Sequence, residues 1–340
     1  MKKISVSRLV FVLALILGIS IITLNSGDVN AKTIKLKMAT EGGAKGTPTA
    51  DSLDLWAKLI EEKSNGEIKV NVYYQGELGG QQELFDQFVQ GNVDMMLTWP
   101  LASYDKTISI LSTPYMVLSW EDALNAYKPN GWLDNLLKEV FTKMSIHYFG
   151  PWPEGFGGVA TAKKFATSIS AAKEIKVRTP PVFPLADTMR ALGYQTADLD
   201  WGEVYTAIQT GVVDGDSCNI IFWDYEYFRD LLDYYVHTKH YFVSWILGMN
   251  KGSWDSLSKE HQKIIEDAAN VVIEKQFKEG KERDEMYRKK AVDAGIEYKT
   301  LSDEEYAQAI KEVRKLVWPK MEEVLGSTIM EKVRVNASTP

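Results

Sequence analysis

The chain has 340 residues, of which 45% are hydrophobic and 25% are charged, and its formal net charge is −7. An acidic chain is a poor candidate for binding nucleic acid or anionic lipid. Its single cysteine, Cys218, excludes an internal disulfide, and the length allows about two domains with cores large enough to need none.

The first thirty-one residues have the pattern of an export signal. A basic start, an apolar run and small residues at a cleavage position follow one another: Lys2, Lys3 and Arg8, then 9–24, then Val29-Asn30-Ala31. The apolar run is shorter than the ~20 residues of a membrane-spanning helix, which disfavours a membrane anchor. We therefore expect cleavage after Ala31, a mature chain from Lys32 with a net charge of −9, and a periplasmic location.

The first half of the mature chain alternates predicted strands and helices. Apolar residues alternate with lysines over 34–38, take helical spacing over 53–60, and alternate again over 68–74. Asn65-Gly66 ends the helix, and the glycine-rich loop 76–80 precedes a further helix. This order of elements predicts a parallel sheet covered by helices.

One phrase then occurs twice, from Glu83 to Asp94 and from Glu203 to Asp214. Each copy reads as an amphipathic helix, a glycine that ends it, and a buried strand beginning Val-Asp. Helix–glycine–strand units recur in many α/β proteins. The shared register nevertheless predicts two lobes of similar topology with a cleft between them.

The second lobe is predicted to begin near Gly155. Its expected elements are a connecting strand over 157–162, a short strand over 175–178, and a helix over 186–192. The apolar stretch 241–250 is expected to cross back to the first lobe. Two capped helices complete the chain, one starting at Ser258 and one at the capping box of 302–305.

Arg178 is the first candidate for a binding residue. It ends a short strand and precedes Pro180-Pro181, and ligands of open α/β sheets bind beyond the carboxyl ends of strands. Its planar guanidinium matches a carboxylate or sulfonate with two parallel hydrogen bonds. The alternative is a surface arginine paired with a nearby carboxylate, which would contribute little.

Further candidates come from loops and aromatic residues. Glu41 follows the first strand and offers an acceptor to a ligand hydroxyl or amine, and Gln81 opens a helix whose N-terminus favours anions. Large aromatic side chains form either flat pocket walls or core. Those in question are Trp99, Trp152, Phe222 and Trp223.

Several phrases resemble the solute-binding proteins of TRAP transporters, a family that delivers organic acids to a sodium-driven membrane carrier. The resemblance covers nearly all of the mature chain in order. The matching segments are 66–70 with 76–80, 90–95, Lys176-Val177-Arg178, the run 203–215, and Asn250 with Trp254 and Leu257.

The resemblance implies a two-lobed periplasmic-binding-protein fold of type II-like character, with mixed, mostly parallel sheets and a long helix bridging the lobes. It places lobe I at 32–153 and 243–281, and lobe II at 154–242 and 282–340. It implies that Arg178 grips the ligand carboxylate and that Asn219 supplies an amide. The family's second arginine is missing from Gly157-Gly158-Val159-Ala160, so a monocarboxylate is favoured over a dicarboxylate.

We accordingly expect a monomeric binding subunit that works with TRAP membrane subunits and uses neither cofactor nor metal. The acidic residues between Asp198 and Asp224 match no calcium loop, and His237 and His240 lack a third zinc ligand. Two alternatives stay open. One is a binding protein for another carrier or a sensor kinase, and the other is a secreted α/β enzyme using His147 and cleft carboxylates.

Overall fold

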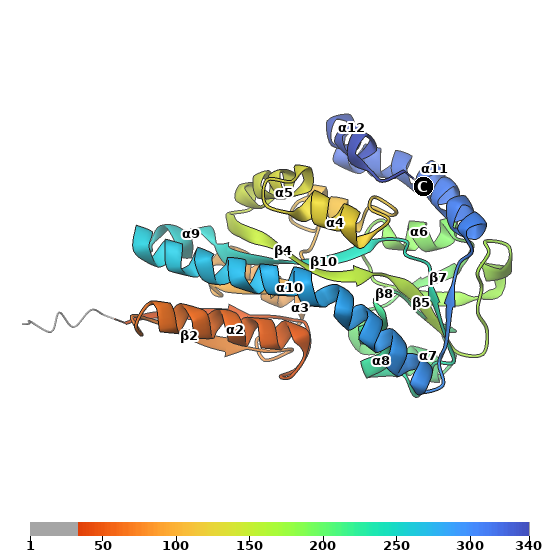
Figure 1. The fold of residues 1–340 in the computed structure, drawn as a ribbon, viewed down its shortest axis with the longest axis horizontal. Helices are drawn as coiled ribbons and strands as arrows, with labels where there is room; N and C mark the ends of the chain where they lie inside the picture. Colours follow the sequence, from red (N-terminus) through yellow and green to blue (C-terminus); the bar gives the residue numbers. More distant parts are fainter. Residues whose placement is uncertain (1–32, 340) are drawn as a thin grey trace, which may run out of the picture.

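The computed structural model describes residues 33–339, which form two α/β lobes joined by crossing strands and a long helix (Figure 1). The two-lobed fold predicted from the sequence is confirmed. The predicted signal peptide, 1–31, lies outside the described residues. Within 33–339, no helix is both long and apolar enough to span a bilayer.

The first lobe is built on a five-stranded mixed sheet, sheet A. In spatial order its strands are β2 (Ile68–Tyr73), β1 (Ile34–Ala39), β3 (Met95–Thr98), β10 (Phe242–Asn250) and β4 (Ile146–Phe156). β1 pairs in parallel with β2 and β3, whereas β10 runs antiparallel to both β3 and β4. The helices of this lobe are α2 (Pro48–Lys63), α3 (Gln81–Gln90), η1 (Lys106–Ser112), α4 (Trp120–Tyr127), α5 (Trp132–Lys143) and α9 (Lys251–Asp255).

The second lobe is built on a six-stranded mixed sheet, sheet B. In spatial order its strands are β11 (Glu297–Thr300), β9 (Tyr234–His237), β5 (Gly158–Thr161), β8 (Gly215–Asn219), β6 (Lys176–Thr179) and β7 (Gln195–Asp198). β6 pairs in parallel with both β7 and β8. The helices that follow these strands are η2 (Ala171–Glu174), α6 (Leu185–Ala191), η3 (Trp201–Glu203), α7 (Val204–Gln209) and α8 (Ile221–Phe228).

Three segments connect the lobes. β4 leads into β5 through Gly157, and the chain returns from β9 to β10 through residues 238–241. The helix α10 (Lys259–Asp293) contacts α2 and β4 of the first lobe and α8 and β11 of the second, as Figure 1 shows. The lobe boundaries given above remain a prediction, although β4 pairs with β10 in sheet A as far as Phe156.

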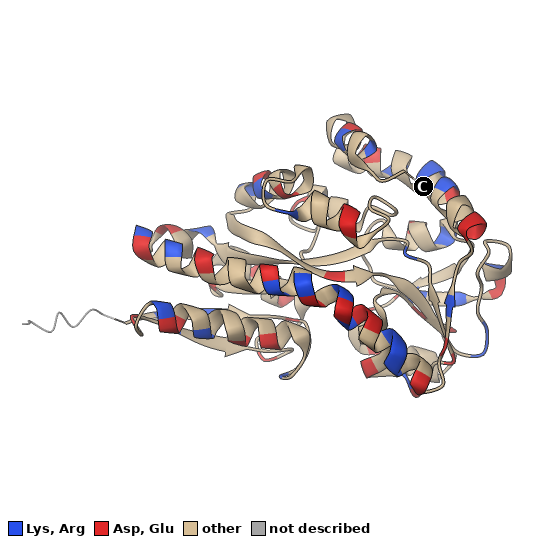
Figure 2. Cartoon of the chain, in the orientation of Figure 1, with Lys and Arg blue, Asp and Glu red and all other residues tan. Residues whose placement is uncertain are grey.

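The predicted helix starts are confirmed by their caps. The Ser258 hydroxyl accepts a hydrogen bond from the His261 N–H, 3.1 Å long, at the start of α10. Ser302 and Glu305 form the predicted capping box of α11 (Asp303–Leu325), which is followed by α12 (Ser327–Asn336). Charged side chains are spread along the outer helices, α10 and α11 included, whereas the sheets between them carry few (Figure 2).

Both copies of the repeated phrase form the predicted helix and glycine turn. Gly91 and Gly211 take left-handed backbone angles, with φ of 81° and 74°. The strands begin later than predicted, at Met95 and Gly215 rather than at Val-Asp. Each aspartate donates its backbone N–H to the carbonyl of a lysine on the neighbouring strand, Lys37 (3.0 Å) or Lys176 (2.7 Å). The N–H of that lysine is bound by the aspartate side chain in place of a backbone carbonyl, at 2.7 Å for Asp94 Oδ2 and 2.8 Å for Asp214 Oδ2.

Candidate functional site

Arg178 lies on β6, between β8 and the edge strand β7 of sheet B, and is only 3% exposed. Its Nε donates to the carbonyl of Leu199 (2.8 Å), and its Nη1 donates to Oδ1 of Asp216 (3.3 Å) on the adjacent strand β8. The guanidinium also lies over the indole of Trp201, 5.8 Å from the ring centroid. These contacts fix the plane of the guanidinium, as recognition by two parallel hydrogen bonds requires.

Asp216 is held from a second side by lobe II. The amide of Asn219 donates to its Oδ2, whereas both carboxyl oxygens of the neighbouring Asp224 on α8 are buried without a hydrogen-bond partner among residues 33–339. Burial, together with the charge of Asp216, raises the pKa of Asp224 well above its usual value, and burial also raises the pKa of Asp216. Arg178, Asp216 and Asp224 are therefore three ionisable side chains buried next to one another in lobe II.

The corresponding polar group of lobe I surrounds Glu41, just after β1. Its Oε1 accepts from the Trp99 backbone N–H (2.7 Å) and from the Thr98 hydroxyl (2.9 Å). The Gln81 amide donates to the carbonyl of Trp99 (3.4 Å), so the structure brings three of the predicted site residues together. Glu41 Oε2 is buried and has no partner among residues 33–339, and burial raises the pKa of this carboxyl to about 7.

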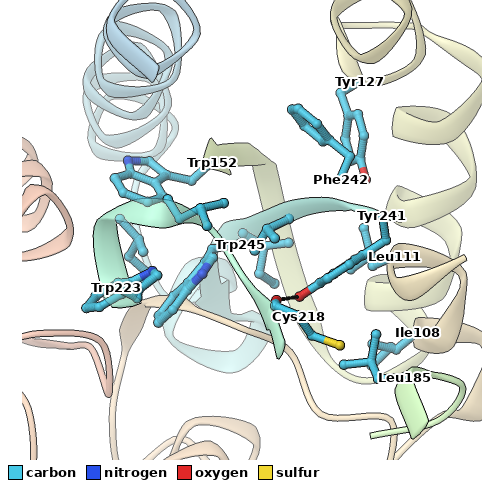
Figure 3. Packing of buried hydrophobic residues seen from close by; sticks show 14 of the residues in the cluster. Ile108, Leu111, Tyr127, Trp152, Leu185, Cys218, Trp223, Tyr241, Phe242 and Trp245 are labelled. Atoms are coloured by element: carbon cyan, nitrogen blue, oxygen red, sulfur yellow. Dashed lines mark hydrogen bonds between the residues drawn. The ribbon is translucent and has the colours of Figure 1, made fainter. Parts of the chain in front are cut away.

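A third group lies where the chain crosses between the lobes. Glu154 on β4 is 4% exposed, and each of its oxygens accepts a hydrogen bond from an indole. Trp223 Nε1 on α8 donates to Oε1 (3.0 Å), and Trp245 Nε1 on β10 donates to Oε2 (2.8 Å). Figure 3 shows the two indoles beside each other, with centroids 6.3 Å apart and planes at 20°. Burial raises the pKa of Glu154 to about 7.

These three groups are joined by a continuous series of contacts. Gly42, next to Glu41, lies so close to Trp245 that a Cβ there would be 2.2 Å from the indole, so only glycine fits. Trp245 contacts Trp223, and Trp223 in turn meets Trp201 edge-on, at 6.2 Å. Since Trp201 lies under Arg178, aromatic surface connects the lobe I carboxylate to the lobe II guanidinium.

A family model described as bacterial extracellular solute-binding protein, family 7, matches residues 38–323. The chain belongs to this family. The predicted resemblance to the solute-binding proteins of TRAP transporters is thereby confirmed, and solute binding is the activity that defines the family.

Curated relatives and solved structures agree with the family match. The chain is 27% identical over 288 residues to the ectoine-binding periplasmic protein TeaA of Halomonas elongata, covering 81% of this chain and 82% of TeaA. It is 22% identical to the 2,3-diketo-L-gulonate-binding periplasmic protein YiaO of Escherichia coli, covering 66% and 69% of the two chains.

Two solved TRAP proteins share the fold. The periplasmic ectoine-binding protein of the Halomonas elongata TRAP transporter superimposes with a TM-score of 0.82 at 23% identity, covering 89% of this chain and 98% of that one. A TRAP solute-binding protein of Sulfurospirillum deleyianum with bound succinate gives 0.79 at 22% identity, covering 89% and 98%.

Two predicted site residues of this solute-binding protein, Trp152 and Phe222, are also tied to neighbouring helices. Trp152 is fully buried, and its Nε1 donates to the Ser52 hydroxyl of α2 (3.1 Å), which makes it part of the packing between β4 and α2. Phe222 packs edge-on against Tyr287 of α10, with centroids 4.8 Å apart. The structure thus gives both rings a packing role.

Gly157, in the segment where the resemblance leads us to expect a second arginine, packs against an aromatic ring. A Cβ on Gly157 would lie 3.0 Å from Tyr241, whose hydroxyl donates to the carbonyl of Cys218 (2.6 Å, Figure 3). A side chain at 157 would therefore have to displace Tyr241. Another cation, Arg283 of α10, lies 5.8 Å from the ring centroid of Trp152 and donates to Gln276 (3.1 Å).

Sequence reasoning missed Glu154, Trp201 and Trp245 and assigned no role to Asp216. Glu154 had a signal, since it stands in Pro-Trp-Pro-Glu-Gly next to the predicted crossing between lobes. Trp201 had a weaker one, because it immediately precedes the second copy of the repeated phrase. Trp245 lies in an apolar run in which nothing marks it as different from its neighbours.

The cysteine and two of the histidines have the following surroundings. Burial raises the pKa of the Cys218 thiol to about 12 and lowers the pKa of His240, 3.3 Å away, to about 3, so the pair is not a thiolate–imidazolium. His147 stacks on Trp254, with centroids 3.8 Å apart, at the start of β4. Over the described range 33–339, no cluster of three or more metal-ligating side chains occurs.

Proposed function

We propose that this protein is the ligand-capturing subunit of a TRAP transporter, and that it binds an organic acid through the carboxylate at Arg178. The supporting observation is the state of the guanidinium. It is buried and held on two nitrogens, whereas Nη2 has no acceptor among residues 33–339. A ligand carboxylate beside Asp216 would accept from this nitrogen in a poorly screened environment, where charge-assisted bonds are strong.

The ligand in this proposal has one carboxylate. The segment Gly157-Gly158-Val159-Ala160, where the resemblance leads us to expect a second arginine, contains none, so a second acid group would lack that cationic partner. At the other end of the aromatic series, the free Oε2 of Glu41 requires a donor, which an N–H or O–H group of the ligand would supply. The indoles between Glu41 and Arg178 favour a ligand whose remaining part is flat or bulky.

The relatives carry ligands of both kinds. Two are named as ectoine-binding or ectoine/5-hydroxyectoine-binding proteins, and solved TRAP proteins hold D-glucuronate or succinate. Ectoine and glucuronate each combine one carboxylate with N–H or O–H donors, whereas succinate has two carboxylates. Our proposal ranks the first two, and aromatic monoacids, above succinate.

A thermal-shift panel followed by calorimetry tests the proposal. We expect ectoine, D-glucuronate or benzoate to raise the melting temperature more than succinate does. Arg178→Lys keeps the positive charge but loses the planar guanidinium and its two parallel N–H donors, so it should weaken that binding at least about tenfold. Arg190→Lys, on the exposed face of α6 in the same lobe, is the matched control.

The proposal fails if no organic acid raises the melting temperature, or if Arg178→Lys binds as tightly as the unchanged protein. A succinate response without any monoacid response would overturn only the ligand ranking. We also propose cleavage after Ala31 and a monomeric state in the periplasm. The N-terminal mass of the exported protein and light scattering in solution would check these two points.

A further inference from the structure

The Glu154 carboxylate differs from the other buried acids in that both oxygens are satisfied by neutral donors from different parts of the molecule. Trp245 belongs to β10, which pairs with β4 in sheet A, so its bond lies within the first lobe. Trp223 belongs to α8, which contacts β5 and β8 of sheet B, so its bond comes from the second lobe. One side chain therefore receives a hydrogen bond from each lobe.

The backbone next to Glu154 is suited to a change of lobe orientation. Gly155 has φ of 142°, a conformation that other residues rarely adopt, Gly157 is the one residue between β4 and β5, and Gly158 is the first residue of β5. Glu154 is on the sheet A side of these glycines, and Trp223 is on the sheet B side. A rotation about the crossing would change the Trp223–Glu154 distance and leave the Trp245–Glu154 distance as it is.

We propose that the Trp223–Glu154 hydrogen bond is a latch that holds the two lobes together, with Trp245 fixing the carboxylate that receives it. A carboxylate is suited to this role because it has two acceptor oxygens, whereas a glutamine has one acceptor and one donor and would leave one indole N–H unpaired. Arg283 of α10 is the charged side chain near Glu154, and its attraction favours the ionised acceptor.

The latch rests on the proposed function, capture of an organic acid, and names one hydrogen bond that holds the lobes together for it. The two indoles that bind Glu154, those of Trp223 and Trp245, also belong to the aromatic surface that connects Glu41 with Arg178. The Trp223 bond thus holds the two lobes together, and it also positions an indole of the proposed ligand site. Loss of the Trp223 bond should release lobe II, whereas loss of the Trp245 bond should not.

Spin labels on the two lobes test this without any ligand. Cysteines replacing Lys58 on α2 and Lys173 on η2 are exposed, and Cys218 is buried. Pulsed EPR would then give the interlobe distance distribution. We expect Trp223→Phe to lower the population at the unchanged protein's distance at least twofold in favour of longer distances. Trp245→Phe, which deletes the same donor from the same carboxylate, should leave the distribution unchanged.

Equal distributions for the unchanged protein and Trp223→Phe would overturn the latch, and so would equal lengthening in both variants. Small-angle scattering of the label-free proteins provides a second measurement, with the larger radius of gyration expected for Trp223→Phe alone. Circular dichroism would verify that each variant is folded. The Arg178→Lys binding test is independent of these distances, so failure of the latch and failure of the proposed function are distinguishable.

Discussion

β3 and β8, the strands that follow the two copies of the repeated phrase, occupy equivalent places in the two lobes. Each pairs in parallel with the strand to which its leading aspartate is bound, β1 and β6 respectively. The pattern of burial is the same, position by position, over 92–100 and 212–220. In this register the predicted site residue Trp99 corresponds to the predicted site residue Asn219, and both are half-buried.

The strand pairs β1–β3 and β6–β8 carry different side chains at equivalent positions. Ala39 pairs with Met96 in the first lobe, and Arg178 pairs with Asp216 at the same place in the second. The first lobe has its charge beyond the strand end, on Glu41. A shared backbone frame thus carries a cation in one lobe and an acid in the other, so one half of the proposed site recognises the carboxylate and the other half accepts a hydrogen bond.

The strongest test of this comparison gives lobe II the uncharged pair of lobe I. Arg178→Ala alone leaves Asp216 buried without its cation and should lower the free energy of unfolding by about 3–5 kcal/mol. Adding Asp216→Met removes that penalty and should restore much of the stability. Binding of any acid should stay at least about 100-fold weaker in both variants.

Urea unfolding and calorimetry on the single and double variants would measure these effects. If the double variant were less stable than Arg178→Ala, Asp216 would not be the partner that the buried arginine requires. If it still bound an acid tightly, the carboxylate would be recognised elsewhere.

The next test concerns what the two copies share. Asp94→Ala and Asp214→Ala each remove the acceptor of a backbone N–H, at Lys37 and Lys176, and should each destabilise the protein by about 1–3 kcal/mol. Asp94 also accepts from the Ser253 hydroxyl (2.6 Å), so Asp94→Ala should cause the larger loss of stability. Chemical denaturation would measure both, and a negligible effect at either site would contradict the equivalence of the copies.

A pH series would sharpen the comparison at Glu41. Because its pKa is raised from 4.5 to about 7 by burial, folding favours its protonated form. The resulting contribution to stability is fully present below pH 4.5 and is lost as the pH rises through about 7. Glu41→Gln keeps an acceptor for Thr98 and Trp99 but does not titrate.

Without ligand, the melting temperature of the unchanged protein should therefore fall relative to that of Glu41→Gln between pH 5 and pH 8. A constant difference over this range would mean that Glu41 does not titrate near neutral pH.

The smallest effect is expected at Cys218, which corresponds to Thr98 in the first lobe. The thiol is fully buried and its pKa is raised to about 12, so it should not react with a thiol reagent in the folded protein. Reaction should become stoichiometric in denaturant. Rapid labelling of the folded protein would show that this part of sheet B opens readily.

The sequence by itself determined the two-lobed fold, the family, the helix caps and Arg178 as a candidate, because these depend on local patterns. Alternation, a serine before a helix or a glycine after it acts over a few residues, and a strand-end arginine before two prolines is visible in one line of sequence. Asp94 and Asp214 were likewise recognisable, and each pairs with the neighbouring strand through its backbone N–H and its side chain together.

Only the tertiary structure decided which aromatic and acidic side chains meet. Phe222 and Trp223 are adjacent and chemically alike, yet one packs on α10 and the other binds Glu154, because successive helical positions face different neighbours. Glu154 and Trp245 are 91 positions apart, and Arg178 and Asp216 are 38 apart. Burial, hydrogen-bond partners and pKa shifts arise from such long-range contacts, which no local pattern encodes.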